Sequence, residues 1–160
     1  MAHGKADMDD VKELTNLGSN ETNYKYDKPC VEMLETFPNK FAPGSGDQGY
    51  LIDMNFPEFT SLCPKTGQPD FARIRLQYIP NENCLESKSL KLYFFAFRSF
   101  GAFMESITNK MLRDFVEASK PRWMQVSADF APRGALAITV HATYDDLRGF
   151  VTEVLRAENA

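Results

Sequence analysis

Histidine and cysteine, the side chains that make up most zinc sites, are scarce in this 160-residue chain. It contains two histidines and three cysteines, and no Cys-x-x-Cys or His-x-x-x-His spacing occurs. A structural zinc site needs four such ligands at short, regular spacings, so no metal site is expected. The odd number of cysteines also argues against a disulfide framework and favours free thiols in a reducing cytoplasm.

Long apolar runs and an excess of basic charge are missing as well. No stretch approaches the roughly 20 apolar residues of a transmembrane helix, and the polar, acidic first ten residues differ from a secretory signal. The net charge of −4 argues against the dense basic face of a nucleic-acid-binding protein. We therefore expect a cytoplasmic protein with neither a membrane nor a nucleic acid as a direct partner.

The hydrophobic content of 43% and the charged content of 25% are ordinary for a globular protein, and the length favours a single domain. Residues 1–48 show little periodicity and are expected to form an irregular N-terminal arm. The main body of the domain is expected over residues 49–144. An apolar stripe in residues 145–160 predicts a C-terminal helix.

Four segments of the main body alternate apolar and polar residues. This alternation predicts antiparallel strands that have one covered face and one polar face. The four segments are residues 50–56, 72–78, 124–130 and 136–142.

About forty residues with helical spacing separate the second predicted strand from the third. Ser89 is expected to cap a first helix that runs to Phe97. An amphipathic stripe predicts a second helix that ends before Pro121. The stripe consists of Phe103, Ile107, Met111 and Phe115. The predicted fold is therefore α+β, a four-stranded antiparallel sheet in the order ββααββ with both helices on one face, and its open edges favour subunit assembly.

Two short segments carry side chains suited to covalent catalysis. Cys63 stands beside a proline, and Asp70 follows seven residues later. Residues 86–91 then combine one acid, two hydroxyls and two lysines. A thiol nucleophile, a nearby proton donor and a separate cluster that attracts phosphate together suggest covalent catalysis with an anionic cofactor. Cys30 and Cys84 lack such surroundings and are expected to be small buried hydrophobes.

Three motifs resemble the QueF family of NADPH-dependent 7-cyano-7-deazaguanine reductases, in its short single-module form. They are the nucleophile segment at residues 58–71, the signature at residues 86–93 and the Arg-Gly element at residues 132–134. The resemblance implies the tunnelling fold, in which sheets join around a ring. It therefore implies a homo-oligomer, for which two stacked pentamers are one arrangement.

The resemblance also implies a reaction, the reduction of a nitrile to a primary amine on a deazaguanine with two NADPH. This step belongs to the biosynthesis of queuosine, a tRNA modification. In the implied chemistry the Cys63 thiolate attacks the nitrile carbon and forms a thioimide, a C=N group that accepts hydride readily. Asp70 supplies the proton for the nitrile nitrogen.

By the same resemblance, two further sets of residues are assigned to ligands. The substrate, 7-cyano-7-deazaguanine, is expected at Leu85, Glu86, Ser87, Met104 and Glu105. The Glu105 carboxylate is an acceptor that suits the adjacent N–H groups of a guanine-type edge. The NADPH contacts are expected at Ser87, Lys88, Arg133 and Gly134. The cations in this second set suit a phosphate-bearing cofactor.

The sequence departs from the family at Met104, where the family has a histidine that contacts the substrate or helps to move protons. Methionine can do no proton chemistry, so either this branch works without the histidine or its activity is changed. Two alternative functions follow: an amidine-forming relative that adds ammonia to the same nitrile without NADPH, and a ring-forming purine-binding protein without catalysis. The retained Lys88, Ser89 and Lys91 argue against the amidine-forming reaction.

Overall fold

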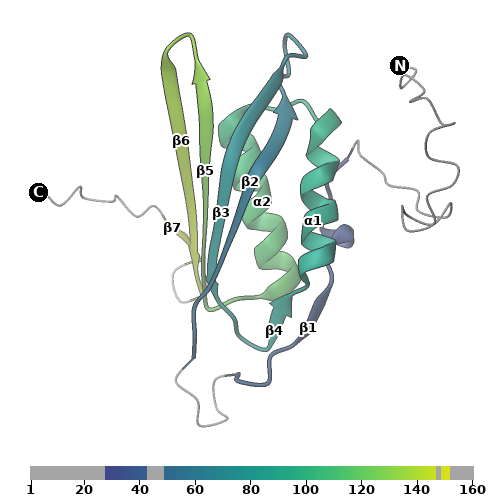
Figure 1. Cartoon of the computed structure of the whole chain (residues 1–160). Helices are drawn as coiled ribbons and strands as arrows, with labels where there is room; N and C mark the ends of the chain where they lie inside the picture. Colours follow the sequence, from purple (N-terminus) through teal and green to yellow (C-terminus); the bar gives the residue numbers. More distant parts are fainter. Residues whose placement is uncertain (1–27, 43–48, 147–148, 152–160) are drawn as a thin grey trace, which may run out of the picture.

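The computed structural model describes residues 28–42, 49–146 and 149–151. Its centre is a five-stranded antiparallel sheet with the strand order β2-β3-β5-β6-β7, and two helices cover one face of that sheet (Figure 1). The strands are β2 (Ile52–Leu62), β3 (Pro69–Ile79), β5 (Trp123–Arg133), β6 (Leu136–Asp145) and β7 (Gly149–Val151). The helices are α1 (Ser87–Ala96) and α2 (Met104–Ser119), and between them lies the short 3₁₀ turn η3 (Phe97–Ser99).

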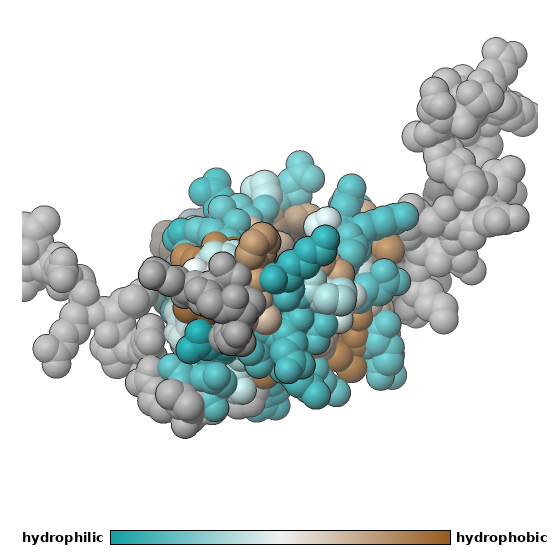
Figure 2. Space-filling model, turned by 90° about the horizontal axis from the view of Figure 1, so that it is seen from below, coloured by the Kyte–Doolittle hydropathy of each residue, from teal (hydrophilic) through white to brown (hydrophobic). Residues whose placement is uncertain are grey.

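A second, two-stranded sheet lies below the start of α1 in Figure 1. Its strands are β1 (Thr36–Pro38) and β4 (Asn83–Leu85), and the 3₁₀ turn η2 (Val31–Met33) precedes them. Figure 2, which views this end from below, shows brown apolar surface between the teal polar residues. The large exposed apolar residues in and beside this second sheet are Phe37, Phe41, Tyr50 and Leu51.

Helix α2 is amphipathic because its buried residues recur every three or four positions. Ile107, Met111 and Phe115 are all buried in the core that the helices share with the sheet. Phe103, which the sequence places in the same stripe, is 66% exposed because the helix begins after it. Lys120 ends the helix in the left-handed conformation, with φ 46°, directly before the proline that predicted this end.

Helix α1 is confirmed, but its predicted cap is wrong, because Glu86 rather than Ser89 is the N-cap residue. The Glu86 carboxylate accepts hydrogen bonds from the backbone N–H groups of Lys88 at 2.8 Å and Ser89 at 2.7 Å. The Ser89 hydroxyl donates to the Glu86 carbonyl at 2.8 Å and accepts from the backbone N–H of Glu35 at 3.0 Å. The helix therefore begins three residues earlier than expected and is tied to the segment that precedes β1.

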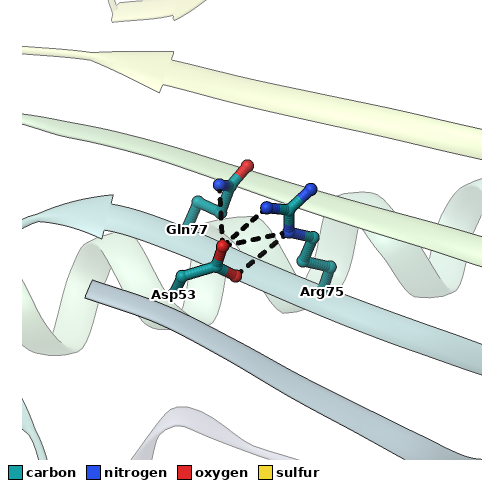
Figure 3. Close-up of polar contacts among 3 residues, drawn as sticks. All are labelled: Asp53, Arg75 and Gln77. Atoms are coloured by element: carbon teal, nitrogen blue, oxygen red, sulfur yellow. Dashed lines mark hydrogen bonds and ion pairs between the residues drawn. The ribbon is translucent and has the colours of Figure 1, made fainter. Parts of the chain in front are cut away.

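The two faces of the large sheet differ as the alternation predicts. The buried face of β3, which packs under the helices, consists of Ala72, Ile74, Leu76 and Tyr78. On the opposite face Arg75 forms an ion pair with Asp53, with Nη2 2.6 Å from Oδ2 (Figure 3). Gln77 donates to the same Asp53 oxygen at 3.1 Å. This face is polar, and two of its charged side chains, Asp53 and Arg75, are paired with each other.

The predicted α+β class is confirmed, but the predicted count of four strands is too small. The sheet has a fifth strand, β7, and β1 and β4 form a sheet of their own. The alternation could not reveal these strands, because three residues are too short to show a period. None of the helices in the described part of the chain is long and apolar enough to cross a membrane.

The ends of the chain were predicted as an arm and a helix. Of the arm, residues 28–42 are described and contain η2 and β1, while 1–27 and 43–48 lie outside the described residues. Of the predicted helix over 145–160, residues 149–151 form β7 instead. Gly149, with φ 73°, pairs with Asp145, so the chain turns back onto β6 there. The rest of that range, apart from 145 and 146, lies outside the described residues.

Candidate active site

Cys63 begins the tip of the β2–β3 hairpin. Its backbone N–H donates to the Gln68 carbonyl at 2.8 Å, and its carbonyl accepts from the N–H of Gly67 at 2.9 Å. Gly67 adopts φ 69°, a conformation that glycine reaches without strain. These bonds fold residues 63–68 into a compact turn that leaves the thiol half-buried.

A β-bulge in β2 decides which face of the sheet Cys63 reaches. The pairing of β2 with β3 is regular as far as Phe56 and resumes at Phe59, with one extra residue in β2. Pro57, which has no N–H for the ladder, lies in the bulge. Before the bulge the even-numbered residues of β2 face the helices, and after it the odd-numbered residues do. The bulge therefore brings Cys63 to the face that carries Asp70.

A second bulge, in β5, does the same for Arg133. The pairing of β5 with β6 is regular as far as Phe130 and resumes at Arg133, again with one extra residue in β5. Pro132 lies in this bulge. Without the extra residue Arg133 would point to the polar face. With it, the Arg133 guanidinium forms an ion pair with Asp70, with Nη1 2.8 Å from Oδ1.

Asp70 is held in a buried position near the start of β3. Its side chain is 3% exposed, and its Oδ1 has no hydrogen-bond partner apart from this contact with the Arg133 guanidinium. Ser61 lies directly opposite Asp70 on β2, and its fully buried hydroxyl has no hydrogen-bond partner. A buried carboxylate and a buried free hydroxyl on neighbouring strands are costly for stability, and such groups are typical of functional sites.

The surroundings of Cys63 make its thiol acidic. Its pKa is lowered from 9.0 to about 7, and the largest cause is a hydrogen bond from the Thr66 hydroxyl. Backbone N–H groups of Thr66 and Lys65 also point to the sulfur, and the Arg133 side chain contributes less. Around neutral pH a thiol of this pKa is roughly half thiolate, the nucleophilic form.

The segment before α2 is attached to the same hairpin. Phe100 and Ala102 bond to the backbone of Leu62, with N···O distances of 3.0 Å and 3.2 Å. Gly101 between them permits the close approach, because a Cβ there would lie 3.4 Å from the Cα of Pro64. This attachment places the start of α2 beside the thiol.

The cavity that results has a volume of about 300 Å³, at the small end of the range for ligand pockets. Its polar lining residues are Cys63, Asp70, Glu105 and Arg133. Its wall is otherwise apolar and includes Ala102, Phe103, Met104, Leu136 and Ile138. A flat, mainly apolar ring with a few polar groups at its edges suits such a lining.

Five of the residues predicted from the sequence therefore meet at this cavity. They are Cys63, Asp70, Met104, Glu105 and Arg133. Gly134 lies next to them at the tip of the β5–β6 hairpin, where it has φ 56° and the following Ala135 has φ 68°. Two successive residues of positive φ between paired strands form a type I′ turn.

The other predicted residues lie elsewhere in the chain. Leu85 is buried, and Ser87 and Lys88 are exposed, all at the start of α1. The start of α1 lies at the lower end in Figure 1, whereas the tips of both hairpins lie at the upper end. The ten residues of α1 alone span about 15 Å. One protomer thus does not bring this set to the cavity.

Glu86 has a structural task that the sequence did not reveal. Its carboxylate caps α1, and the backbone N–H groups of Lys88 and Ser89 hold the pKa of Glu86 below its usual value. Ser87 next to it lines a second, smaller cavity of about 160 Å³ together with Lys91. The start of α1 therefore offers exposed cationic and hydroxyl groups beside a separate hollow.

Two residues beside the lining residues were not expected from the sequence: Ser61, which lies opposite Asp70, and Thr66, which bonds to Cys63. Thr66 stands three residues after Cys63 in a tight turn, which is the signal that could have identified it, because a hydroxyl there can bond back to the start of the turn. Ser61 gives no such signal, because its position opposite Asp70 depends on the bulge in β2.

Comparison with known proteins identifies relatives of this chain. Residues 69–148 match the family described as QueF-like protein. The chain is 46% identical over 137 residues to the NADPH-dependent 7-cyano-7-deazaguanine reductase of Streptococcus mutans, covering 86% of this chain and 82% of the relative. It is 45% identical over 135 residues to the protein of the same name from Bacillus subtilis, covering 84% and 79%.

A solved structure shows the same fold at lower identity. The crystal structure of the archaeosine synthase QueF-Like in the apo form superposes with a TM-score of 0.56 and 19% identity. The superposition covers 60% of this chain and 93% of that one. With the identities above over most of its length, the chain belongs to the QueF-like protein family.

Proposed function

We propose that the protein is an NADPH-dependent 7-cyano-7-deazaguanine reductase, a cytoplasmic enzyme of queuosine biosynthesis that converts the nitrile of its substrate to an aminomethyl group. The observation that supports this most is the meeting of an acidic thiol, Cys63, with a buried carboxylate, Asp70, at one cavity. Relatives at 45–46% identity carry this activity in their names.

In the proposed first step the Cys63 sulfur attacks the nitrile carbon. An S–C bond forms and one C–N π bond breaks, while the proton of the thiol ends on the nitrogen, so the step needs no outside acid. Asp70 lines the same cavity and is suited to carry this proton, because a carboxylate can accept it and then donate it. The product is a thioimide on Cys63.

Two NADPH molecules, bound one after the other, would each supply one hydride to this carbon and so convert the nitrile to the aminomethyl group. The part of the chain described here fits such a cofactor through its cations. The Arg133 guanidinium is 42% exposed at the cavity, and Ser87 and Lys88 are exposed at the start of α1. These groups would hold phosphate oxygens through charge-assisted hydrogen bonds.

Glu105 and Met104 would form the rim that orients the substrate. The exposed Glu105 carboxylate can accept hydrogen bonds from a guanine-type edge, the role that the family resemblance implies. Met104 contributes an apolar wall and no proton. Since Met104 cannot replace the family's histidine in moving protons, the proton transfers near the sulfur fall to Asp70.

We also propose that the active enzyme is a ring-shaped homo-oligomer whose sites lie between protomers. Two observations support this. The predicted substrate and cofactor residues at the start of α1 lie a helix length from the cavity of their own protomer. Large apolar side chains are exposed at both ends, and those at the upper end are Phe71, Phe103 and Leu136. A second copy can cover these side chains and supply residues 85–88 to the Cys63 cavity.

Mixing the protein with 7-cyano-7-deazaguanine and NADPH tests this function. We expect loss of the nicotinamide absorbance, two NADPH per amine formed, and no loss with Cys63→Ala. The amidine-forming alternative, which the methionine at position 104 leaves open, predicts instead that ammonia consumes the nitrile while NADPH stays reduced. A purine-binding protein without catalysis predicts that the nitrile is bound and not consumed.

A further inference from the structure

The Asp70–Arg133 ion pair permits Asp70 to relay the thiol proton in the first step, but it leaves Asp70 with no proton of its own for the two hydride-transfer steps. A salt bridge requires a charged carboxylate, so Asp70 holds no proton while Arg133 is in place. Reduction of a nitrile to an amine consumes two hydrides and two protons. The thiol proton is returned when the sulfur leaves, so both protons must come from solvent through a group that can carry one.

The groups that face Asp70 leave it as the carrier. Ser61 lies opposite it on β2 and Arg133 of the β5–β6 hairpin is paired with it, while Cys63 and Glu105 line the same cavity. Arg133 cannot release a proton in this pH range, and Cys63 is bonded to the substrate during the first hydride transfer. Glu105 is exposed and is expected to hold the far edge of the substrate.

We propose that Arg133 is a switch residue, paired with Asp70 in the free enzyme and drawn to a phosphate of the nicotinamide cofactor when that binds, so that Asp70 takes up its proton only in the cofactor complex. The proposal rests on the proposed reductase function. It gives Arg133 a task in timing protonation, in addition to the cofactor contact expected from the sequence.

The two partners of the ion pair differ in how far they are exposed, which supports a movement of Arg133 from Asp70 to the cofactor. Asp70 is 3% exposed in a paired strand, whereas Arg133 is 42% exposed at the end of β5, next to the hairpin tip. Around Gly134 at that tip the space is open, because no atom other than those of its two chain neighbours lies within 4 Å of where a Cβ would be. The long arginine side chain can therefore turn outward while the carboxylate stays in place.

The buried Ser61 hydroxyl can stabilise Asp70 in the cofactor complex, where Arg133 has moved away and Asp70 carries a proton. Residues directly opposite on antiparallel strands have Cβ atoms about 4.5–5.5 Å apart, so the side chains of Ser61 and Asp70 are neighbours across the two strands. This hydroxyl has no hydrogen-bond partner in the described structure. Once Arg133 has left, a buried carboxyl group without a cation is more stable when it is neutral, and Ser61 can accept its proton in a hydrogen bond.

Proton uptake on cofactor binding tests the switch without any turnover. NADP⁺ is titrated by calorimetry at pH 7 in two buffers with different heats of ionisation, using Cys63→Ala so that the thiol does not titrate. We expect the Cys63→Ala variant to take up more protons per site on NADP⁺ binding than the double variant Cys63→Ala/Asp70→Asn. The difference should be a measurable fraction of one proton. The phosphate of NADP⁺ titrates equally in both proteins and cancels in the difference.

Two arginine variants complete the test. Adding Arg133→Gln should abolish the Asp70-dependent uptake and weaken NADP⁺ binding, because Asp70 is then already released. Adding Arg113→Gln, at an exposed position of α2, should leave the difference unchanged. Equal uptake with and without Asp70, although NADP⁺ binds, would overturn the switch and leave the reductase function intact. Failure of NADP⁺ to bind at all would overturn the proposed cofactor and the switch together.

Discussion

Thr66→Val is predicted to make the Cys63 thiol less acidic by about one pKa unit. The Thr66 hydroxyl is the largest of the causes that lower the Cys63 pKa from 9.0 to about 7, while the backbone N–H groups of Thr66 and Lys65 remain in the variant. If the hydroxyl supplies about half of this lowering, the Cys63 pKa of the variant is about 8.

The rate of alkylation by iodoacetamide, with Cys63 identified by mass spectrometry, measures this change. At pH 6 the thiolate fraction falls from about 10% to about 1%, but a thiolate of higher pKa is intrinsically about threefold more nucleophilic. We therefore expect the variant to react about three- to fourfold more slowly at pH 6 and about threefold faster at pH 10. The two pH–rate curves should cross.

Thr66→Ser is the matched control, because it retains the hydroxyl and should keep the midpoint near 7. The rate should rise with pH in every variant, since deprotonation creates the nucleophile. A wild-type midpoint close to that of an ordinary thiol, or a Thr66→Val curve that coincides with the wild-type curve, would refute this explanation of the acidity.

Three further predictions concern the reaction and the assembly. Asp70→Asn should bind substrate nearly normally but form the covalent adduct about 10²- to 10⁴-fold more slowly in stopped-flow measurements, and near wild-type rates would exclude proton transfer by Asp70. Met104→His should raise the rate of NADPH oxidation or reduce the release of imine, because histidine can exchange a proton near neutral pH. No change in either would show that Asp70 is sufficient for the proton transfers. Sedimentation at micromolar concentration should show a closed oligomer, and a monomer alone would contradict the shared site.

The helices and strands that are long enough to show a repeating apolar pattern were predicted from the sequence. Alternation in β3 and β5 and the apolar stripe of α2 correspond to buried faces in the structure. The cap of α1 was not predicted correctly, because serine is a preferred N-cap residue and glutamate is not, yet Glu86 caps the helix and the Ser89 hydroxyl bonds to the Glu86 carbonyl. β7 was mistaken for part of a helix because its three residues follow the same apolar pattern.

For the candidate site, the sequence alone does not predict which face of the sheet Cys63 and Arg133 reach. In the sequence, Cys63 follows a strand whose even-numbered residues are apolar, so simple alternation puts its side chain on the face opposite to Asp70. The bulges that contain Pro57 and Pro132 reverse this, and each depends on pairing with a neighbouring strand. The motif therefore predicts Cys63 and Asp70 as site residues, but their shared face and the contact with Arg133 could be seen only in the structure.

Mass spectrometry of the intact protein tests most directly whether Cys63 is the nucleophile of this site. The protein is mixed with 7-cyano-7-deazaguanine in the absence of NADPH, so that any thioimide accumulates. We predict the addition of one substrate mass per subunit in the wild type and in Cys30→Ala, and none in Cys63→Ala. An adduct that persists in Cys63→Ala, or a wild-type protein that binds the nitrile and gains no mass, would contradict the central claim.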